Sequence, residues 1–449
     1  MAAAISRHFM PLSLSNIQDL RTVLGRLDAE RPADERPDRG RTLYEPRGDD
    51  FLNRLDLEVQ SRRGKTRLLV TGQIGVGKSS ELWRYFHGEK AERRIGFPIY
   101  CDLEKQESPE HCGATGVLLT MLRDCWGSLD YYLKQQQQTL QGELERIRDE
   151  IISRLIEHLK GNRNNDEVVF RFGGMNFGVS IADHRKNGAL HLILAKAAQH
   201  EAVSDPAERF GVAPDAMVTM LNQLLRWMRK RFGDRPPTLI VDHVDKIREP
   251  KAAEDVLVRA FTHWDRIEAS LIMTAPYEFT LGALRNSVES RWGAPRVLYP
   301  LPIPEPDNGP IPCIFVNIAK NAGLSQLLPE ESLRLMAHYS GGILRSYVQF
   351  VIAAAKEAHF SGHDVVEATD ALAVIHSAER AYQDYSIDDF RLLDQVVDSD
   401  TGLRDAVTLL RSPIVLLVTE GQDGQQKLRV HPLARQALER FQRRTKAIA

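Results

Sequence analysis

The residues best suited to chemistry lie in one short stretch, residues 72–79, with the sequence GQIGVGKS. Its three glycines let the backbone turn its N–H groups inward around phosphate oxygens. Lys78 adds a cation that reaches the β- and γ-phosphates, and the Ser79 hydroxyl is a ligand for Mg²⁺. The spacing matches G-x-x-x-x-G-K-[ST] without a gap and therefore predicts a nucleoside triphosphate site.

The segments on either side of this stretch fit a phosphate-binding loop, or P-loop. Residues 68–70 are an apolar run that predicts a buried strand, and a helical pattern starts at Ser80 and continues through Leu82 and Phe86. A helix that starts at the loop adds its dipole to the amides around the phosphate. We expect ATP and Mg²⁺ as cofactors. The expected nucleotide contacts are Gly72, Gln73, Ile74, Gly75, Val76, Gly77, Lys78, Ser79 and Ser80.

A second motif, TLIVDHVD at residues 238–245, resembles a Walker B strand. A buried strand would deliver Asp242 to the site, where its carboxylate holds Mg²⁺ through water, so Ser79 and Asp242 are the expected metal ligands. Many P-loop ATPases place Glu next to polarise the attacking water, but this chain has His243, to which we assign no catalytic role. Asp245 is the nearest carboxylate. Either Asp245 positions the water and turnover is slow, or hydrolysis is weak and bound nucleotide acts as a latch.

Composition sets the broad class of the protein. The chain has 449 residues, 43% hydrophobic residues and a net charge of −2, which predicts two to four globular domains without an overall polyanion-binding surface. It contains no run of eighteen or more apolar residues and no signal-peptide pattern at its start. We therefore expect a cytoplasmic protein that does not bind membranes.

The second motif and the segments that follow it in the chain resemble the STAND branch of P-loop ATPases, which is related to AAA+ and origin-recognition ATPases. The D-x-x-D spacing from Asp242 to Asp245 is similar to the STAND Walker B. Residues 271–276, LIMTAP, resemble the sensor 1 strand, and the resemblance implies that Thr274 senses the γ-phosphate. Residues 340–345, SGGILR, resemble the sensor 2 motif, which implies the same for Arg345; the family commonly has Pro where Leu344 stands.

The resemblance implies three further contacts, each with an ordinary alternative. Ser290-Arg291-Trp292 precedes a strand expected at 296–301, where AAA+ proteins often carry an arginine finger; a surface salt bridge explains Arg291 equally well. Tyr44 and Arg47 precede the first strand, where related proteins contact adenine, but a packed tyrosine and a solvated arginine fit as well.

We expect an α/β fold, with a P-loop NTPase core of AAA+/STAND type built on a parallel sheet, a helical lid and a C-terminal winged helix. The predicted domains are an N-terminal helix, linker and adenine-side segment (1–60), the ATPase core with a hairpin insertion near 168–181 (61–304), the lid (305–384) and the winged helix (385–449).

Two functions follow from these expectations. The first is an ATP-dependent switch. It controls either the assembly of a homo-oligomer or the activity of a separate effector protein in a hetero-complex. The resemblance implies a place in bacterial antiphage defence. The second is a DNA-associated ATPase that loads or positions another protein, because seven basic residues face one acid in the last 25 positions. Nucleic acid is then a partner of 385–449, although a protein-contact role or simple solvation explains this charge too. A small-molecule kinase is a weaker third option.

Overall fold

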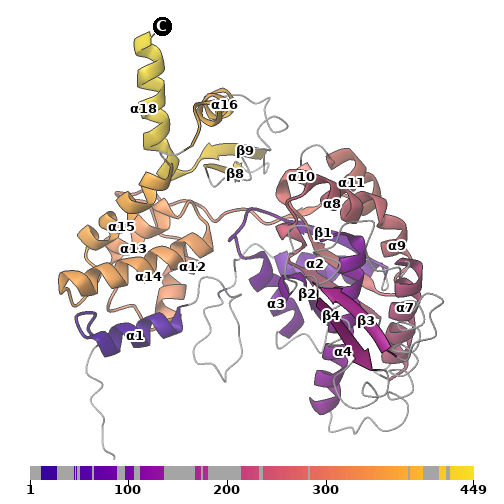
Figure 1. The fold of residues 1–449 in the computed structure, drawn as a ribbon. Coiled ribbons are helices and arrows are strands. Elements are labelled where there is room, and N and C mark those ends of the chain that lie inside the picture. The colour runs from indigo at the N-terminus through magenta and orange to yellow at the C-terminus, as the bar shows by residue number, and fades with distance from the viewer. Residues whose placement is uncertain are drawn as a thin grey trace, which may run out of the picture. The chain divides into compact units, whose positions relative to one another are not determined.

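The computed structural model describes residues 12–27, 45, 47, 51–62, 65–87, 97–105, 112–135, 167–172, 175–180, 214–231, 236–281, 284–382, 385–397, 414–420 and 425–448 (Figure 1). The chain divides into two compact units. Residues 50–71 and 81–297 form one, here called the sheet unit, and residues 1–49, 72–80 and 298–449 form the other, here called the lid unit.

The sheet unit is built on five parallel strands in the order β2-β5-β6-β1-β7. Their bounds are Arg67–Thr71 (β1), Phe97–Asp102 (β2), Pro237–Asp242 (β5), Ser270–Thr274 (β6) and Arg296–Val297 (β7). Because all five strands are parallel, their carboxyl ends meet at one edge of the sheet. The expected α/β core of a P-loop NTPase is thus confirmed.

Alternation along the strands gives the sheet two apolar faces, as its burial on both sides requires. On one face Leu69, Val241 and Met273 pack with α4 (Ala114–Gln135) and α7 (Pro214–Arg231). On the other, Val70, Ile240 and Ile272 pack with α2 (Phe51–Ser61) and α3 (Lys78–His87). The remaining elements of this unit are η3 (Leu103–Lys105), η6 (Val244–Lys246), α8 (Pro250–Glu254), the π-helical turn η7 (Asp255–Arg259), α9 (Phe261–Asp265), α10 (Tyr277–Leu281) and α11 (Arg285–Trp292).

The two runs around Gly173-Gly174 form the antiparallel strands β3 (Glu167–Phe172) and β4 (Met175–Ser180), in a sheet of their own. The strand expected at 296–301 is shorter than predicted and ends at Val297. Pro300 and Pro302 lack the N–H that a longer strand would need, and the Leu301 N–H donates instead to the Gly342 carbonyl at 2.9 Å.

The lid unit contains the expected helical lid, four helices whose bounds are Cys313–Asn321 (α12), Glu330–Tyr339 (α13), Leu344–Ser361 (α14) and Ala368–Ala381 (α15) (Figure 1). The N-terminal helix α1 (Ile17–Arg26) packs on α14. The C-terminal module consists of α16 (Ile387–Val397), the antiparallel pair β8 (Val415–Glu420) and β9 (Gln425–Val430), and α18 (Pro432–Ile448). The helix expected at 403–410, which a winged helix needs, lies outside the described residues. Among the described helices, none is both long and apolar enough to cross a membrane.

Candidate nucleotide-binding site

The P-loop connects the end of β1 at Thr71 to the start of α3 at Lys78. Its glycines adopt backbone conformations that other residues rarely take, with φ of 152° at Gly72, 85° at Gly75 and 104° at Gly77. A Cβ at Gly72 would lie 2.3 Å from the Leu298 carbonyl oxygen. These positions therefore require glycine, both for the turn itself and for the close approach of neighbouring backbone.

The Lys78 side chain folds back along the loop. Its Nζ donates to the carbonyl oxygens of Gly72 at 2.8 Å and Gln73 at 3.0 Å, and the side chain is almost fully buried. This holds the ammonium group against two backbone carbonyls of the glycine loop, which a phosphate would replace as its partners. The glycine conformations and this cation fit a bound triphosphate. Of the other predicted contacts, Val76 is buried, Ser79 and Ser80 are half-buried, and Ile74 is exposed.

Both predicted arginines of the lid unit lie against the P-loop. The Arg47 guanidinium donates to the Val76 carbonyl at 2.6 Å and also to the Tyr299 carbonyl. The Arg345 backbone N–H, in the first turn of α14, donates to the Gly75 carbonyl at 3.1 Å. A lid helix and the segment that precedes the core thus contact the same phosphate loop. Tyr44, the other predicted adenine contact, lies outside the described residues.

The P-loop also contacts the C-terminal module. The Gln73 side chain is 5% exposed, and its Nε2 donates to the Val415 carbonyl of β8 at 2.6 Å. Its other side-chain atom, Oε1, is buried and has no hydrogen-bond partner. Gln73 therefore connects two segments that are 342 residues apart in the chain.

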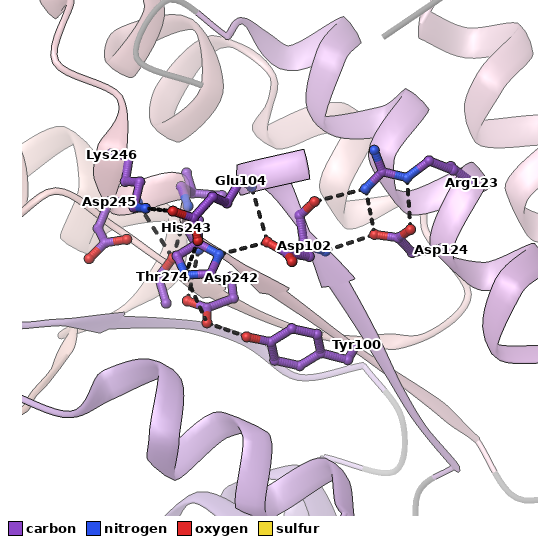
Figure 2. Close-up of polar contacts among 11 residues, drawn as sticks. Tyr100, Asp102, Glu104, Arg123, Asp124, Asp242, His243, Asp245, Lys246 and Thr274 are labelled. Atoms are coloured by element: carbon purple, nitrogen blue, oxygen red, sulfur yellow. Dashed lines mark hydrogen bonds and ion pairs between the residues drawn. The ribbon is translucent and has the colours of Figure 1, made fainter. Parts of the chain in front are cut away.

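In the sheet unit, Asp242 is fully buried at the carboxyl end of β5 (Figure 2). Its Oδ1 accepts the His243 backbone N–H at 2.8 Å, and its Oδ2 accepts the Tyr100 hydroxyl of the neighbouring strand β2. Thr71, the last residue of β1, ends at the same edge of the sheet. Buried carboxylates need such donors, and a hard oxygen at this edge suits Mg²⁺.

Thr274 and Asp245 lie beside Asp242 (Figure 2). The Thr274 hydroxyl, fully buried at the end of β6, accepts the backbone N–H groups of Val244 at 3.0 Å and Asp245 at 3.4 Å. Thr274 thereby fixes the turn η6 that carries Asp245. The roles of both residues in catalysis stay predictions.

His243 has a left-handed backbone, with φ of 66°, and its ring lies among carboxylates. Its Nδ1 is 2.7 Å from Asp102 Oδ1, and its Nε2 is 3.4 Å from Glu104 Oε2 and 3.8 Å from Asp242 Oδ2. Burial lowers the pKa of His243, but the hydrogen bond to Asp102 and the negative charges of Asp242, Asp102 and Asp245 outweigh burial and raise it to about 9. The ring is therefore a cation at neutral pH, which offsets part of the negative charge at this edge.

Asp102, Glu104 and His243 each offer one ligand atom, and these atoms lie within 4.8 Å of one another. A single divalent cation can join groups at that spacing if it displaces the proton of the His243 ring. In this structure His243 pairs with both carboxylates instead, and Glu104 also pairs with Lys246. Asp102 is held further by its backbone N–H, which donates to Asp124 Oδ2 at 2.8 Å.

Arg291 is placed differently from the other predicted site residues. It is exposed on α11, and its guanidinium donates to the Ser287 carbonyl at 2.9 Å and to the Ser290 hydroxyl at 3.3 Å. Both partners, Ser287 and Ser290, lie on α11 itself. A role across a subunit interface stays a prediction.

Sequence reasoning did not identify Tyr100, Asp102 or the contacts of His243. One signal was present: Asp102 ends a predicted strand, and the carboxyl ends of parallel strands meet at one edge. In the pairing of β2 with β5, Asp102 lies opposite Asp242 and Tyr100 lies opposite Ile240. The register, which no local pattern shows, brings these side chains together.

No protein-family model and no curated protein matches the chain. Several solved structures are similar to it. The Walker-type ATPase paby2304 of Pyrococcus abyssi is 12% identical with a TM-score of 0.44, over 91% of this chain and 99% of that chain. The ORC2 protein of Aeropyrum pernix is 12% identical with a TM-score of 0.41, over 95% and 98%. The ORC1 protein of the same organism, solved with DNA, is 14% identical with a TM-score of 0.39, over 90% and 95%. Likeness at this level does not extend to what those proteins bind or do.

Proposed function

We propose that this protein is an ATP-responsive switch, in which phosphate at the P-loop sets the state of the lid and of the C-terminal module. The module in turn controls self-association or a separate partner protein. ATP with Mg²⁺ is the proposed ligand, held by Gly72, Gly75, Gly77 and Lys78, with Ser79 and Asp242 as metal ligands. A bound Mg²⁺ would neutralise part of the phosphate charge. The residues of the chain bind the nucleotide, orient its phosphates and respond to their presence.

The observation that carries this proposal is the hydrogen bond from Gln73 Nε2 to the Val415 carbonyl. A P-loop side chain that binds only phosphate has no need of a partner in a C-terminal strand. The lid contacts the same loop, since a Cβ at Gly75 would lie 2.9 Å from both Arg345 Cβ and Ile343 Cγ2. Any change in the conformation of the loop around phosphate therefore alters its contacts with both the lid and β8.

The lid and the C-terminal module also pack closely on each other. Gly341, in the turn before α14, has φ of 64°, and a Cβ there would lie 2.6 Å from His431 Nε2 and 2.9 Å from Leu416 Cδ1. His431 directly precedes α18, and its ring stacks on Tyr382 of the lid segment with centroids 5.5 Å apart. The three parts of the lid unit, P-loop, lid and module, thus share buried contacts through which a change at one can reach the others.

The switch is tested by hydrogen exchange of β8 in the full chain with and without ATP and Mg²⁺. We expect ATP to change the protection of the amides of Leu416 and Leu417, and Lys78→Ala to abolish the change together with ATP binding. Gln73→Ala should leave β8 equally weakly protected in both conditions, whereas Gln18→Ala, at an exposed glutamine of α1, should behave like the parent. Tight ATP binding with no change at β8 would refute the switch.

Turnover and assembly test the latch version of the proposal. ATP hydrolysis and molecular mass are measured with and without ATP for the parent and for Asp245→Asn. Assembly on ATP with negligible turnover in both proteins supports a latch. Turnover that is present in the parent and lost in Asp245→Asn supports Asp245 as the residue that positions the attacking water.

DNA association is a second candidate, favoured by the exposed basic residues of the C-terminal module. These are Lys427 and Arg429 on β9 and Arg435, Arg440 and Arg443 on α18. Between Arg435 and Arg443, α18 carries a single acidic residue, Glu439. Its carboxylate pairs with the Arg443 guanidinium at 3.6 Å. If the module binds DNA, the affinity should fall steeply with salt, and removing Lys427 and Arg429 together should lower the slope by about 2. Arg380→Ala, an exposed arginine of α15, is the control.

A further inference from the structure

Tyr100 lies beside the Walker B carboxylate but belongs to neither nucleotide motif. It occupies β2, two residues before that strand ends at Asp102, and β2 pairs with β5 so that Asp102 lies opposite Asp242. Tyr100 is 7% exposed. Its hydroxyl points along the sheet toward Asp242 and donates to Oδ2 of that carboxylate (Figure 2).

Aromatic packing fixes the Tyr100 ring in this position. Trp83 contacts it edge-on, with ring centroids 4.8 Å apart and planes at 90°, and Phe86 lies 5.8 Å away. Both aromatic residues are on α3, the helix that begins with Lys78 of the P-loop. Pairs of this geometry add stabilisation beyond area burial, and a tyrosine ring has only two side-chain torsions to fix. Packing on α3, the helix that begins at the phosphate loop, therefore fixes the orientation of the hydroxyl.

The hydrogen bonds of Asp242 leave it able to bind a cation. Oδ1 accepts one backbone N–H, Oδ2 accepts the Tyr100 hydroxyl and lies 3.8 Å from His243 Nε2, and each carboxylate oxygen has two acceptor sites. Each oxygen thus keeps capacity for a metal-bound water. A tyrosine phenol is protonated at neutral pH, so the Tyr100 hydroxyl is the donor in this hydrogen bond. A neutral donor orients the carboxylate without cancelling its charge.

We propose that Tyr100 is a positioning residue, whose hydroxyl holds the Asp242 carboxylate in the orientation that binds the divalent cation accompanying the nucleotide. The inference rests on the proposed nucleotide site and adds a residue to it. Without the hydroxyl, the carboxylate keeps its charge but gains freedom to rotate about its side-chain torsions. The cation must then fix that rotation on binding, which costs affinity.

The test is Tyr100→Phe in the full chain, with Mn²⁺ as the probe cation. Mn²⁺ affinity is measured by electron paramagnetic resonance with ATP present, and ATP affinity is measured separately in EDTA. One hydrogen bond contributes about 0.5 to 1.5 kcal/mol, so we expect Mn²⁺ affinity to fall about 2- to 12-fold. ATP affinity in EDTA should stay within about twofold of the parent, because the hydrogen bond that Tyr100→Phe removes goes to the Asp242 carboxylate.

Tyr85→Phe is the matched control. Tyr85 is also buried on α3, and its hydroxyl donates to Asp56 Oδ1 at 3.1 Å. This variant loses a hydroxyl and a carboxylate hydrogen bond too, so any loss from destabilisation alone appears in both proteins. Only Tyr100→Phe should weaken Mn²⁺ binding.

A double-mutant cycle keeps the inference testable if Tyr100→Phe is less stable than the parent. In the Asp242→Asn background, Tyr100→Phe should cause no further loss of Mn²⁺ affinity, because the carboxylate it orients is gone. Equal losses in both backgrounds would overturn the assignment, as would Mn²⁺ affinity in Tyr100→Phe equal to or above that of the parent. Failure of the switch leaves these measurements unaffected, since they do not involve β8.

Discussion

We expect the contact between the lid and the C-terminal module to depend on pH through His431. The side chain is 1% exposed, and its Nδ1 accepts the backbone N–H of Leu433 at 3.3 Å in the first turn of α18, in the manner of an N-cap. Burial, the main cause, and the nearby His338 lower the pKa of His431 from 6.5 to about 4, against a smaller opposing effect of a hydrogen bond to the Ser340 backbone. Protonation would remove the Nδ1 acceptor and place a charge against Gly341 and the ring of Tyr382.

The sign of the effect follows from the two pKa values. The unfolded chain takes up the proton near pH 6.5 and the folded chain only near pH 4, so the unfolded state binds more protons between these values. Stability should therefore fall as the pH drops from 6.5 to 4 and become level below that. The full loss is about 3 kcal/mol, and about 2 kcal/mol of it should be present at pH 5. Losses of this size are a large part of the stability of a typical domain.

The assay is urea unfolding of the full chain at pH 7 and pH 5, read by a brief hydrogen-exchange pulse at one fixed pH. Peptides from β8 and α18 report the C-terminal module. We expect His431→Asn to lose about 2 kcal/mol less than the parent between the two pH values, because asparagine also caps a helix but does not titrate. His376→Asn, at an exposed histidine of α15, should keep the parental pH dependence. The same pH dependence in His431→Asn as in the parent, or a His431 pKa of 6.5 or more by NMR, would refute the reasoning.

Three further substitutions test separate parts of the structure. Gly75→Ala should abolish ATP binding in calorimetry, because φ of 85° is strained for alanine and its Cβ would lie 2.9 Å from Arg345 Cβ; unchanged affinity would contradict the loop geometry. Thr274→Val should lower the free energy of unfolding by about 1 to 3 kcal/mol, since the Val244 N–H loses its buried acceptor, and this loss should appear as a lower midpoint of thermal unfolding. Thr22→Val on α1 should have a smaller effect. Arg67→Met should cost several kcal/mol in urea unfolding, because the guanidinium bonds the carbonyls of Thr66, Asp265, Ile267 and Ala269; a loss below about 1 kcal/mol would show that water replaces it.

The sequence predicts those parts of the fold and site that depend on local patterns. The P-loop glycines and Lys78 are adjacent in the chain, and their chemistry needs only that spacing. Apolar runs predict β1, β5 and β6 because strands buried on both faces are continuously apolar. The helical lid follows in the same way from apolar residues at three- and four-residue spacing.

Other parts depend on pairings between distant segments and have no local signal. Tyr100 and Asp242 are 142 residues apart, and they meet only because β2 pairs with β5 in one register. A shift of that register by one residue would turn Tyr100 to the other face of the sheet. The strand at 296–301 was predicted too long for a related reason, since its end depends on where Leu301 finds a partner, and that partner is Gly342.

The division of the chain into units assigns the P-loop to the lid unit. The boundaries fall at Thr71 and Gly72 on one side and at Ser80 and Glu81 on the other, so they enclose the phosphate loop and separate it from the strand and most of the helix that flank it. The contacts of the loop explain this assignment: Gly75 bonds the backbone of Arg345, Val76 bonds Arg47, and Gln73 bonds β8. A loop attached only to its own sheet could hold phosphate equally well without these contacts. Their presence is the observation behind the proposal that the loop senses phosphate as well as binding it.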